Sequence, residues 1–273
     1  MNTKIQYTIE DLEYADIPLL SDMPPRDWEF DIVSFMKRFY HQPWFYAIKV
    51  VHDEVIAGTG SILFNNGTSW LSNIIVRPEY RENRIGSAVT ERLLEVSHEM
   101  ECPSCLLMAT EAGRGLYARL GFVEDGMFCY YRNNVPLPFS PTGNITPVRN
   151  DELQVILQLD RQVTGEDRGE MLNGHLHGAY VYRKDGEISG FYLPGIGDEP
   201  VVATHPVAGK SLLGFKHSFS GKTTVIPEEN RWAAGFFSEH GIEPFSCRIR
   251  MVHGVPPCWD PEGVFCRIEG YYC

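Results

Sequence analysis

The stretch that decides the fold is Leu71-Ser-Asn-Ile-Ile-Val-Arg-Pro-Glu-Tyr-Arg-Glu-Asn-Arg-Ile-Gly-Ser-Ala-Val-Thr-Glu-Arg-Leu-Leu94. Its β-branched start predicts a strand, which must stop at Pro78 because proline has no N–H to donate to a sheet. A short loop then ends in Gly86-Ser87, and apolar residues such as Val89 and Leu93 follow at helical spacing. The stretch therefore predicts a strand, a short loop and an amphipathic helix in direct succession.

Gly86 at the helix entrance leaves backbone N–H groups uncovered. These unpaired donors and the positive end of the helix dipole together favour an anion, and a phosphate group suits them well. Many loops of α/β proteins share this feature, so it does not by itself identify a ligand.

Working outward, periodicity predicts further elements on both sides. Strands are expected over residues 6–12, 44–52, 55–64, 70–76, 105–110 and 126–132, and helices over 15–20, 28–41, 87–100 and 113–120. Asn66-Gly67 carries the hairpin signal between two of these strands. A meander of strands followed by two strand-to-helix units predicts an α/β layer structure with helices on both faces of a sheet.

The second half of the chain repeats the end of the first. Asn230–Ile242 aligns without a gap on Thr110–Phe122, and each segment follows a short apolar strand and ends its helix at a glycine. We interpret this as an internal duplication; the alternative is two unrelated helix ends with glycine caps. Between the halves, the proline-rich stretch 133–144 cannot sustain a helix or a central strand.

Composition excludes several classes of protein. The 273 residues carry 24 Lys plus Arg against 36 Asp plus Glu, a formal charge of −12, which argues against a nucleic-acid binder. The acidic balance favours cationic or neutral partners. No apolar run approaches the length of a membrane span, and the start of the chain lacks the apolar stretch of a signal peptide. We therefore expect a cytoplasmic protein without membrane contact.

Cysteine and histidine usage predicts neither a metal nor a disulfide framework. The seven cysteines, in a chain without an export signal, are expected to be mostly reduced and buried thiols. Cys102-Pro-Ser-Cys105 lacks a second pair to complete a zinc site, and the nine histidines show no ligand spacing on a common helix. We expect no metal.

Two motifs resemble those of a known superfamily. Val76-x-Pro78-x-x-Arg81-x-x-Arg84-Ile85-Gly86-Ser87-Ala88 resembles the pyrophosphate loop of the GNAT superfamily of acetyl-CoA-dependent N-acyltransferases, and Leu116-Tyr117-x-x-x-Gly121-Phe122 resembles its second motif. The resemblance covers roughly residues 5 to 132. The second half resembles the shorter partner domain of tandem members.

This resemblance implies an α/β (α+β) fold of two GNAT-like domains, each a mixed, mostly antiparallel sheet flanked by helices. Residues 1–132 would form the acetyl-CoA-binding catalytic domain, 133–144 the linker, and 145–273 a degenerate GNAT-like domain. In the degenerate copy, Phe237 replaces the tyrosine and residues 206–210 are too few for a pyrophosphate loop, so no second cofactor is expected. The copy would form a wall of the acceptor site or a homodimer contact.

The resemblance also assigns roles to residues. The backbone of the strand segment Ile74, Ile75 and Val76 would pair with the pantetheine arm, and a backbone N–H of that strand would hold the oxyanion. Tyr117 would protonate the departing thiolate. The backbone amides expected to cradle the pyrophosphate belong to Arg81, Glu82, Asn83, Arg84, Ile85, Gly86 and Ser87.

This sequence departs from the family pattern at three points. Arg84 stands where glycine is usual, so either the loop takes a conformation that a Cβ tolerates or the match fails at this position. The Arg84 guanidinium could instead reach a phosphate as a charge-assisted donor. Thr110 replaces a frequent asparagine. Ser72 and Asn73 provide no carboxylate, so the general base is left open between Glu111, a residue of the first 45, and a water chain.

The implied function is an N-acetyltransferase that moves an acetyl group from acetyl-CoA to a primary amine by direct attack in a ternary complex. The acceptor would be a small-molecule or peptide amine. Two alternatives remain: a catalytically inactive, CoA-responsive binding or regulatory protein, and an acyltransferase for longer acyl chains.

Overall fold

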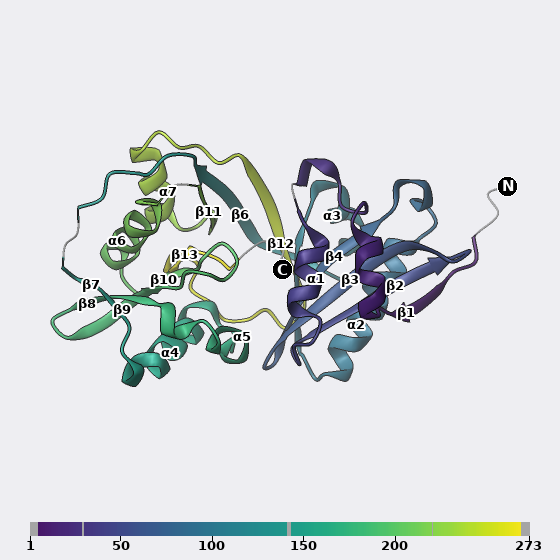
Figure 1. Ribbon diagram of the computed structural model, residues 1–273, viewed down its shortest axis with the longest axis horizontal. Coiled ribbons are helices and arrows are strands. Elements are labelled where there is room, and N and C mark those ends of the chain that lie inside the picture. The colour runs from purple at the N-terminus through teal and green to yellow at the C-terminus, as the bar shows by residue number, and fades with distance from the viewer. Residues whose placement is uncertain (1–4, 29, 141–142, 220, 269–273) are drawn as a thin grey trace.

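The computed structural model describes residues 5–28, 30–140, 143–219 and 221–268, so Cys273 lies outside the described residues. Figure 1 shows two lobes, with the N-terminal half on the right and the C-terminal half on the left. Long strands run between the lobes and connect them.

The first half follows the predicted order of elements closely. Its strands are β1 (Thr8–Asp11), β2 (Phe45–His52), β3 (Val55–Asn65), β4 (Thr68–Val76), β5 (Ser104–Ala109) and β6 (Val123–Asn133). Its helices are the 3-10 helices η1 (Tyr14–Leu20), η2 (Arg26–Trp28) and η3 (Pro78–Tyr80), and the α-helices α1 (Ile32–Phe39), α2 (Ile85–Glu99) and α3 (Glu111–Arg119).

The second half repeats a strand–helix alternation. Its strands are β7 (Ile145–Pro147), β8 (Tyr180–Lys184), β9 (Glu187–Tyr192), β10 (Val201–Ala203), β11 (Lys222–Pro227), β12 (Ser246–Gly254) and β13 (Val264–Cys266). Its helices are η4 (Asn150–Glu152), α4 (Leu153–Thr164), α5 (Gly169–Asn173), η5 (Leu176–Gly178), α6 (Pro206–His217), α7 (Arg231–Glu239) and η6 (Pro261–Gly263).

The strands form two mostly antiparallel sheets flanked by helices, which confirms the predicted fold class. In the described parts of the chain, the larger sheet has the strand order β1-β2-β3-β4-β5-β12-β6-β11, and the smaller has the order β13-β10-β9-β8-β7. The pairing of β4 with β5 is parallel, whereas the other strand pairs of the described residues are antiparallel.

The two halves exchange strands within the larger sheet. The exchanged strands are those that come directly after the last α-helix of each half: β6 follows α3, and β12 follows α7. Strand β12 pairs with β5 of the first half, and β6 pairs with β11 of the second half, so the central order β5-β12-β6-β11 is symmetric (Figure 1). This symmetry supports the predicted duplication.

A disulfide joins the two exchanged strands, β6 and β12. Cys129 on β6 and Cys247 on β12 are paired in the register and joined through their Sγ atoms. The expectation that the cysteines are reduced is therefore wrong for this pair, because the strand exchange places two thiols 118 residues apart in sequence directly opposite one another. Cys102, Cys105, Cys258 and Cys266 are free, and Cys258 is exposed rather than buried.

Two glycines in β3 let α2 lie directly on the sheet. A Cβ added at Gly58 would come within 2.7 Å of Ile85, and one at Gly60 within 2.4 Å of Val89. Both partners belong to the buried apolar face of α2. The close approach fixes the N-terminus of α2 beside the end of β4.

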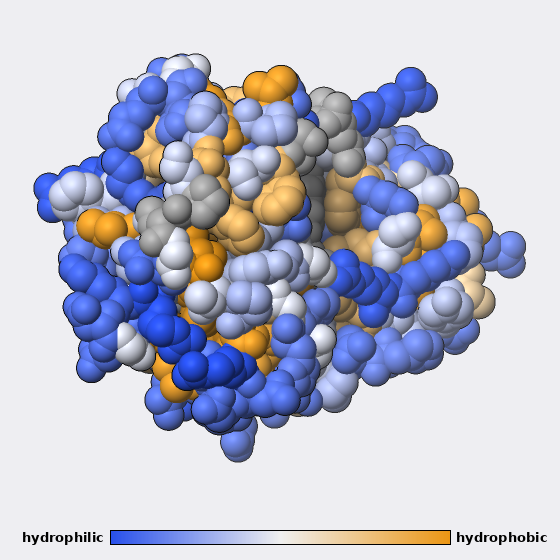
Figure 2. Space-filling model, turned by 60° about the vertical axis from the view of Figure 1, so that its left-hand side comes forward, coloured by the Kyte–Doolittle hydropathy of each residue, from blue (hydrophilic) through white to orange (hydrophobic). Residues whose placement is uncertain are grey.

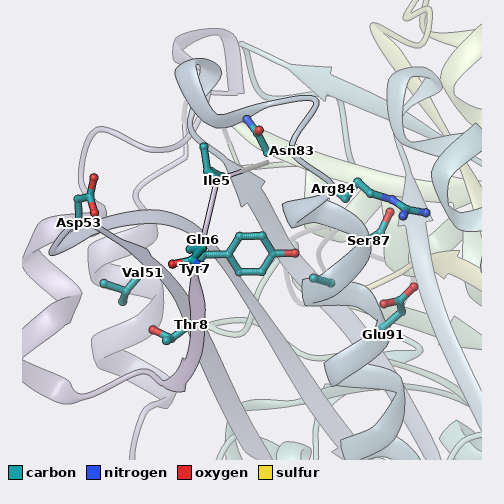
Figure 3. Close-up of a pocket in the computed structure, with 11 residues that line it drawn as sticks. Ile5, Gln6, Tyr7, Thr8, Val51, Asp53, Asn83, Arg84, Ser87 and Glu91 are labelled. Carbon is teal, nitrogen blue, oxygen red and sulfur yellow. The ribbon is translucent and has the colours of Figure 1, made fainter. Parts of the chain in front are cut away.

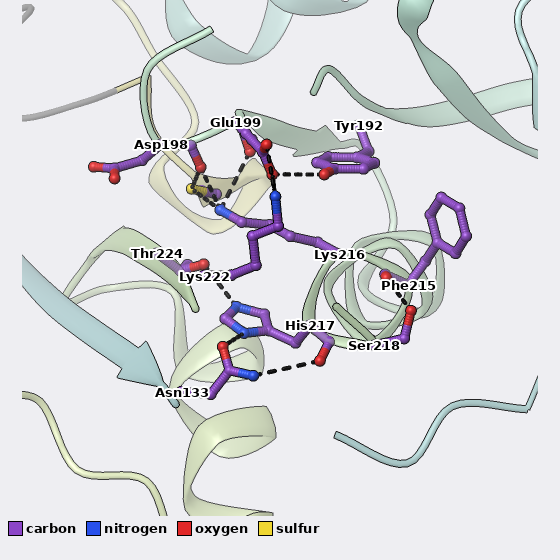
Figure 4. Close-up of polar contacts among 11 residues, drawn as sticks. Asn133, Tyr192, Asp198, Glu199, Phe215, Lys216, His217, Ser218, Lys222 and Thr224 are labelled. Carbon is purple, nitrogen blue, oxygen red and sulfur yellow. Dashed lines mark hydrogen bonds and ion pairs between the residues drawn. The ribbon is translucent and has the colours of Figure 1, made fainter. Parts of the chain in front are cut away.

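In the second half, β13 occupies the space between β10 and β11. It pairs with β10, and the backbone N–H of Arg267 just beyond it donates to Val225 O on β11. The buried Lys216 ammonium of α6 stabilises β13 in this place. The ammonium lies 3.0 Å from Cys266 Sγ and donates to the carbonyls of Asp198 and Glu199 (Figure 4). Burial raises the pKa of the Cys266 thiol, so this strand is held with a neutral sulfur.

No helix within the described residues is long and apolar enough to cross a bilayer. Within the same residues, no three His, Cys, Asp or Glu side chains gather as metal ligands would. The face in Figure 2 shows apolar atoms in separate patches among hydrophilic ones. A homodimer contact remains a prediction.

The strand exchange makes a direct prediction. A chain cut after Asn144 would lack β11 and β12, leaving β6 with no neighbouring strand and β5 with an exposed edge. We expect this fragment to aggregate or to unfold without a cooperative transition, whereas the full chain unfolds cooperatively in a thermal melt followed by circular dichroism. A cooperative melt of the fragment would show that the exchange is dispensable.

Candidate functional site

Strands β4 and β5 separate to form an opening in the sheet. Their pairing runs only from Thr68–Ser104 to Trp70–Leu106, although β4 continues to Val76. On its other side β4 stays paired with β3, interrupted by a bulge where Asn73 takes a φ of 54°. Among the residues that the structure describes, no strand therefore pairs with this edge of β4 over its second half.

Backbone groups of the predicted residues face this opening. The backbone N–H of Arg77 donates to Ala57 O on β3. Backbone groups of every second residue of a strand point to the same side, so Ile75, which lies opposite Thr59, also bonds to β3. The N–H and C=O groups of Ile74 and Val76 then point away from β3, toward the side where β5 has separated. In this structure the Nε of Arg81 donates to Val76 O at 3.4 Å.

The loop after β4 wraps into the N-terminus of α2. Asn83 closes it, because its side-chain nitrogen donates to the carbonyls of Tyr80 and Arg81 at 3.2 and 3.1 Å. The first hydrogen bond of the helix runs from Ala88 N to Arg84 O. Within the described part of the chain, the N–H groups of residues 85–87 donate to no acceptor, so three unpaired donors lie at the loop.

Two residues of this loop adopt the left-handed conformation that favours glycine. Glu82 has a φ of 67°, and Arg84, at the position where the family pattern has glycine, has a φ of 64° and a ψ of 12°. Arg84 therefore has the left-handed backbone that glycine adopts most easily. A Cβ in this conformation costs roughly 1 to 2 kcal/mol.

Substituting glycine at this position should stabilise the fold. Arg84→Gly removes the Cβ strain but adds backbone freedom to the unfolded chain, so we expect the free energy of unfolding to rise by about 0.5 to 1 kcal/mol. Urea denaturation of both proteins measures this difference. An unchanged or lower stability would mean that the arginine side chain makes stabilising contacts that outweigh the strain.

Gly86 lies in the first turn of α2 and faces α3. A Cβ added there would come within 3.2 Å of Leu116 Cδ1 and 3.8 Å of Val76 Cγ2. The structure therefore brings together the end of β4, the start of α2 and the middle of α3.

Tyr117 follows Leu116 and packs over the first turn of its own helix. Its Cε2 atom would lie 2.8 Å from a Cβ at Gly113, and its ring meets Phe122 edge-on at 5.9 Å between centroids. Its hydroxyl forms no hydrogen bond within the described residues, and burial raises the pKa of the phenol to about 12. The phenol is therefore neutral near neutral pH and has a proton to donate.

Three residues that depart from the family pattern, and the candidate base Glu111, lie in different surroundings. Ser72 and Asn73 are buried and bond to Ser61 on β3, Ser72 at 2.8 Å and Asn73 at 2.9 Å. Thr110 caps α3 by accepting from Gly113 N at 3.2 Å. Glu111, in the first turn of α3, is exposed and lies 3.9 Å from Arg114.

The second half covers the face of β4 opposite α2. Glu166, buried in the loop after α4, accepts from Trp70 Nε1 at 2.6 Å and from Asn65 Nδ2 at 2.9 Å. The guanidinium carbon of Arg267 lies 3.8 Å from the centroid of the Trp70 ring. Buried Arg250 on β12 adds a guanidinium 4.2 Å from the ring of Trp259. The contacts of Glu166 and Arg267 hold the second half against Trp70, where the pairing of β4 with β5 ends.

Sequence reasoning missed the Glu166 contact, because a single glutamate in a loop carries no pattern that identifies its partners. The close packing of α2, in contrast, had a signal in Gly58-Thr-Gly60, two glycines on one face of a predicted strand. The bulge at Asn73 had no sequence signal.

A sheet that opens between two parallel strands, with a helix N-terminus and a tyrosine beside the opening, defines an α/β protein with a candidate site for an elongated anionic ligand. Residues 10–122 match the model of the acetyltransferase (GNAT) family. This match falls on the half of the chain in which the two motifs lie, so that half is similar to the GNAT acetyltransferase family. No curated protein matches the sequence.

Solved structures share the fold over nearly the whole chain. A Pyrococcus horikoshii protein described as an acetyltransferase superposes with a TM-score of 0.82 and 22% identity, covering 99% of this chain and 97% of its own. A GCN5-related N-acetyltransferase from Sphaerobacter thermophilus superposes with a TM-score of 0.66 and 12% identity, covering 93% and 97%. The fold that these structures share with this chain therefore extends over both of its halves.

Proposed function

We propose that this chain is an acetyl-CoA-dependent N-acetyltransferase that transfers an acetyl group directly to a primary amine. The observation that carries the proposal is the free edge of β4 next to the unpaired N–H groups of residues 85–87. An extended pantetheine arm fits the first as an added strand, and a pyrophosphate fits the second.

The residues of the site match the chemistry of this reaction. Attack of an amine on a thioester gives a tetrahedral oxyanion, which a backbone N–H of the open β4 edge would stabilise. Collapse of this intermediate expels a thiolate, and the neutral Tyr117 phenol would donate the proton that it needs. The base that deprotonates the amine is left open, with exposed Glu111 as one candidate.

We further propose that residues 145–273 form a second GNAT-like domain without a cofactor of its own. In chain order β10 and β11 correspond to β4 and β5, because each of these strands is followed by a helix. The counterpart of the opening between β4 and β5 therefore lies between β10 and β11. Strand β13 fills that opening, and Phe265 would collide with any Cβ at Gly209 of α6, at 2.2 Å. The domain instead contributes the Glu166 loop as a wall on the acceptor side.

An amine panel tests the proposed reaction. The full chain is incubated with acetyl-CoA and with polyamines, aminoglycosides, amino acids or lysine peptides, while free thiol and acetylated product are measured by a thiol reagent and mass spectrometry. We expect one class of amine to release thiol and gain an acetyl group in equal amounts. Binding of acetyl-CoA without turnover across the panel would favour the CoA-responsive regulatory protein instead.

A further inference from the structure

A small cavity lies between the larger sheet and the second half of the chain. It measures about 20 Å³, which is room for a small polar group but not for a ring. Three side chains of the sheet and three of the second half form most of its wall: Trp70 of β4, Phe128 of β6 and Arg250 of β12, and Glu166, Trp259 and Arg267. The cavity is therefore built jointly by the two halves.

This cavity is separate from the larger groove beside α2. That groove, of about 850 Å³, lies between β1 and the start of α2 and includes Asn83, Arg84 and Ser87 of the loop described above (Figure 3). No described residue lines both spaces. The small cavity therefore lies apart from the loop that we propose for the pyrophosphate of the donor.

The side chains around the cavity carry more positive than negative charge. The guanidinium of Arg168, which also lines it, is neutralised by buried Asp160 through hydrogen bonds of 3.0 and 2.5 Å. Glu166 then supplies a carboxylate, whereas Arg250 and Arg267 supply two guanidinium groups. Oε2 of Glu166 is already occupied as an acceptor by Trp70 Nε1 at 2.6 Å. Such a lining favours a negatively charged group.

Arg250 has a hydrogen-bond donor that the fold does not use. Its side chain is only 2% exposed, and its Nε–H has no acceptor within the described residues. Asp125 Oδ2 lies 3.4 Å from Nη1 of Arg250 but accepts no hydrogen bond in this part of the chain. Burial lowers the pKa of the Arg250 guanidinium, because water does not solvate its charge. A carboxylate oxygen would satisfy this buried donor and its charge together.

The cavity adjoins the opening between β4 and β5. Trp70, in its wall, belongs to the last residue pair between these strands, opposite Leu106. Arg250 lies opposite Met108, two residues further along β5, where β4 has already separated. Two residues of a strand span about 7 Å. A group attached a few bonds from an amine at the opening can therefore reach the cavity.

We propose that this cavity binds a carboxylate of the acceptor, so that the acceptor is an amine with a carboxylate a few bonds away, as in an amino acid. Arg250 donates its Nε–H to the carboxylate. Its guanidinium is held against the ring of Trp259, 4.2 Å from the centroid, and is thus oriented before the acceptor arrives. This inference rests on the proposed function, because it names the class of amine that the same site acetylates.

Pairs of amino acids and their amides isolate the contribution of the carboxylate. Glycine, β-alanine, phenylalanine and lysine are compared with their amides, which keep the amine but lose the negative charge, and kcat/KM is measured with acetyl-CoA. We expect wild type to favour the amino acid of the most reactive pair at least about 10-fold, because a charge-assisted hydrogen bond to a buried guanidinium has that magnitude. Equal values for each amino acid and its amide would overturn the assignment and leave the cavity to water.

Arg250→Gln should remove this preference by lowering kcat/KM for the amino acid to that for its amide. Arg248→Gln is the matched control, because Arg248 lies on the same strand but donates to Ser246 Oγ and Cys247 O and does not line the cavity. The control should keep the preference of wild type. A preference that survives in Arg250→Gln, or that is lost in both variants, would contradict the role of Arg250.

Arg250→Lys replaces the glutamine variant if a thermal melt shows that the latter does not fold. Lysine keeps the positive charge but lacks the planar fork of donors, so we expect the preference for the amino acid to fall several-fold. A preference equal to that of wild type would overturn the hydrogen bond assigned to Arg250.

Calorimetry separates this inference from the proposed reaction, because it needs no turnover. The same amino acids and amides are titrated into the full chain with coenzyme A present. Amino acids that bind at least about 10-fold more tightly than their amides, with no acetylation by acetyl-CoA, would overturn the proposed function and leave the carboxylate site standing. Acetylation of amines without any preference for the amino acids would overturn the carboxylate site and leave the function standing.

Discussion

Tyr117→Phe should lower turnover about 10²-fold while the affinity for acetyl-CoA stays the same. The reason is that the substitution removes a proton donor and little else, and general acid catalysis contributes at least this factor. The phenyl ring keeps its packing on Gly113 and Phe122, and the lost hydroxyl has no hydrogen bond within the described residues. Steady-state rates with a responsive amine, together with calorimetry, measure the two quantities separately.

Tyr131→Phe is the control for this experiment. Tyr131 is a largely buried tyrosine on β6 whose ring stacks on Phe237, away from α2 and α3. Its replacement should leave turnover within about twofold of wild type, because it removes a hydroxyl that lies away from the proposed reacting groups. Equal rates for wild type and Tyr117→Phe would remove Tyr117 from the mechanism and direct attention to other acids or to solvent.

Gly86→Asp should weaken acetyl-CoA binding by about 10³-fold or more while the protein remains folded. The new carboxylate would stand in the first turn of α2, where the unpaired N–H groups are expected to hold a pyrophosphate, and like charges in contact cost several kcal/mol. Folding is expected to survive because the nearest atom, Leu116 Cδ1 at 3.2 Å, ends a flexible side chain. A carboxylate near a helix N-terminus is itself favourable.

Gly115→Asp places the same charge on α3 as a control. An added Cβ there would meet only Arg119 Nη1 at 3.6 Å, so the side chain has space outside the proposed cradle. Its affinity for acetyl-CoA should stay within a few-fold of wild type, since an exposed charge acts only through screened solvent. Micromolar binding retained by Gly86→Asp would contradict the assignment of the loop.

Local patterns predicted the part of the fold that surrounds the site. The strand ending before Pro78, the loop through Gly86 and the apolar face of α2 follow from residue types within a few positions of each other. Such features depend on neighbours in sequence, which is why the sequence alone was sufficient. The left-handed backbone of Arg84 was not predicted, because one expectation was a loop conformation that a Cβ tolerates and the other was a failed match at this position.

Long-range pairing could not be predicted in the same way. Nothing near Cys129 or Cys247 indicates that β6 and β12 lie side by side. The two cysteines are 118 residues apart in sequence, and they meet because the two halves exchange strands. The contact of Glu166 with Trp70 likewise joins elements 96 residues apart. Register and side-chain pairing across such separations are set by the whole sheet rather than by local propensity.

The most direct test of the account is a calorimetric titration of acetyl-CoA into the full chain. We predict one site per chain, because the opening between β4 and β5 is free while β13 fills its counterpart between β10 and β11. No binding would contradict the proposed acetyl transfer and leave the fold without the activity. Two sites per chain would contradict the assignment of the second half as a domain without a cofactor.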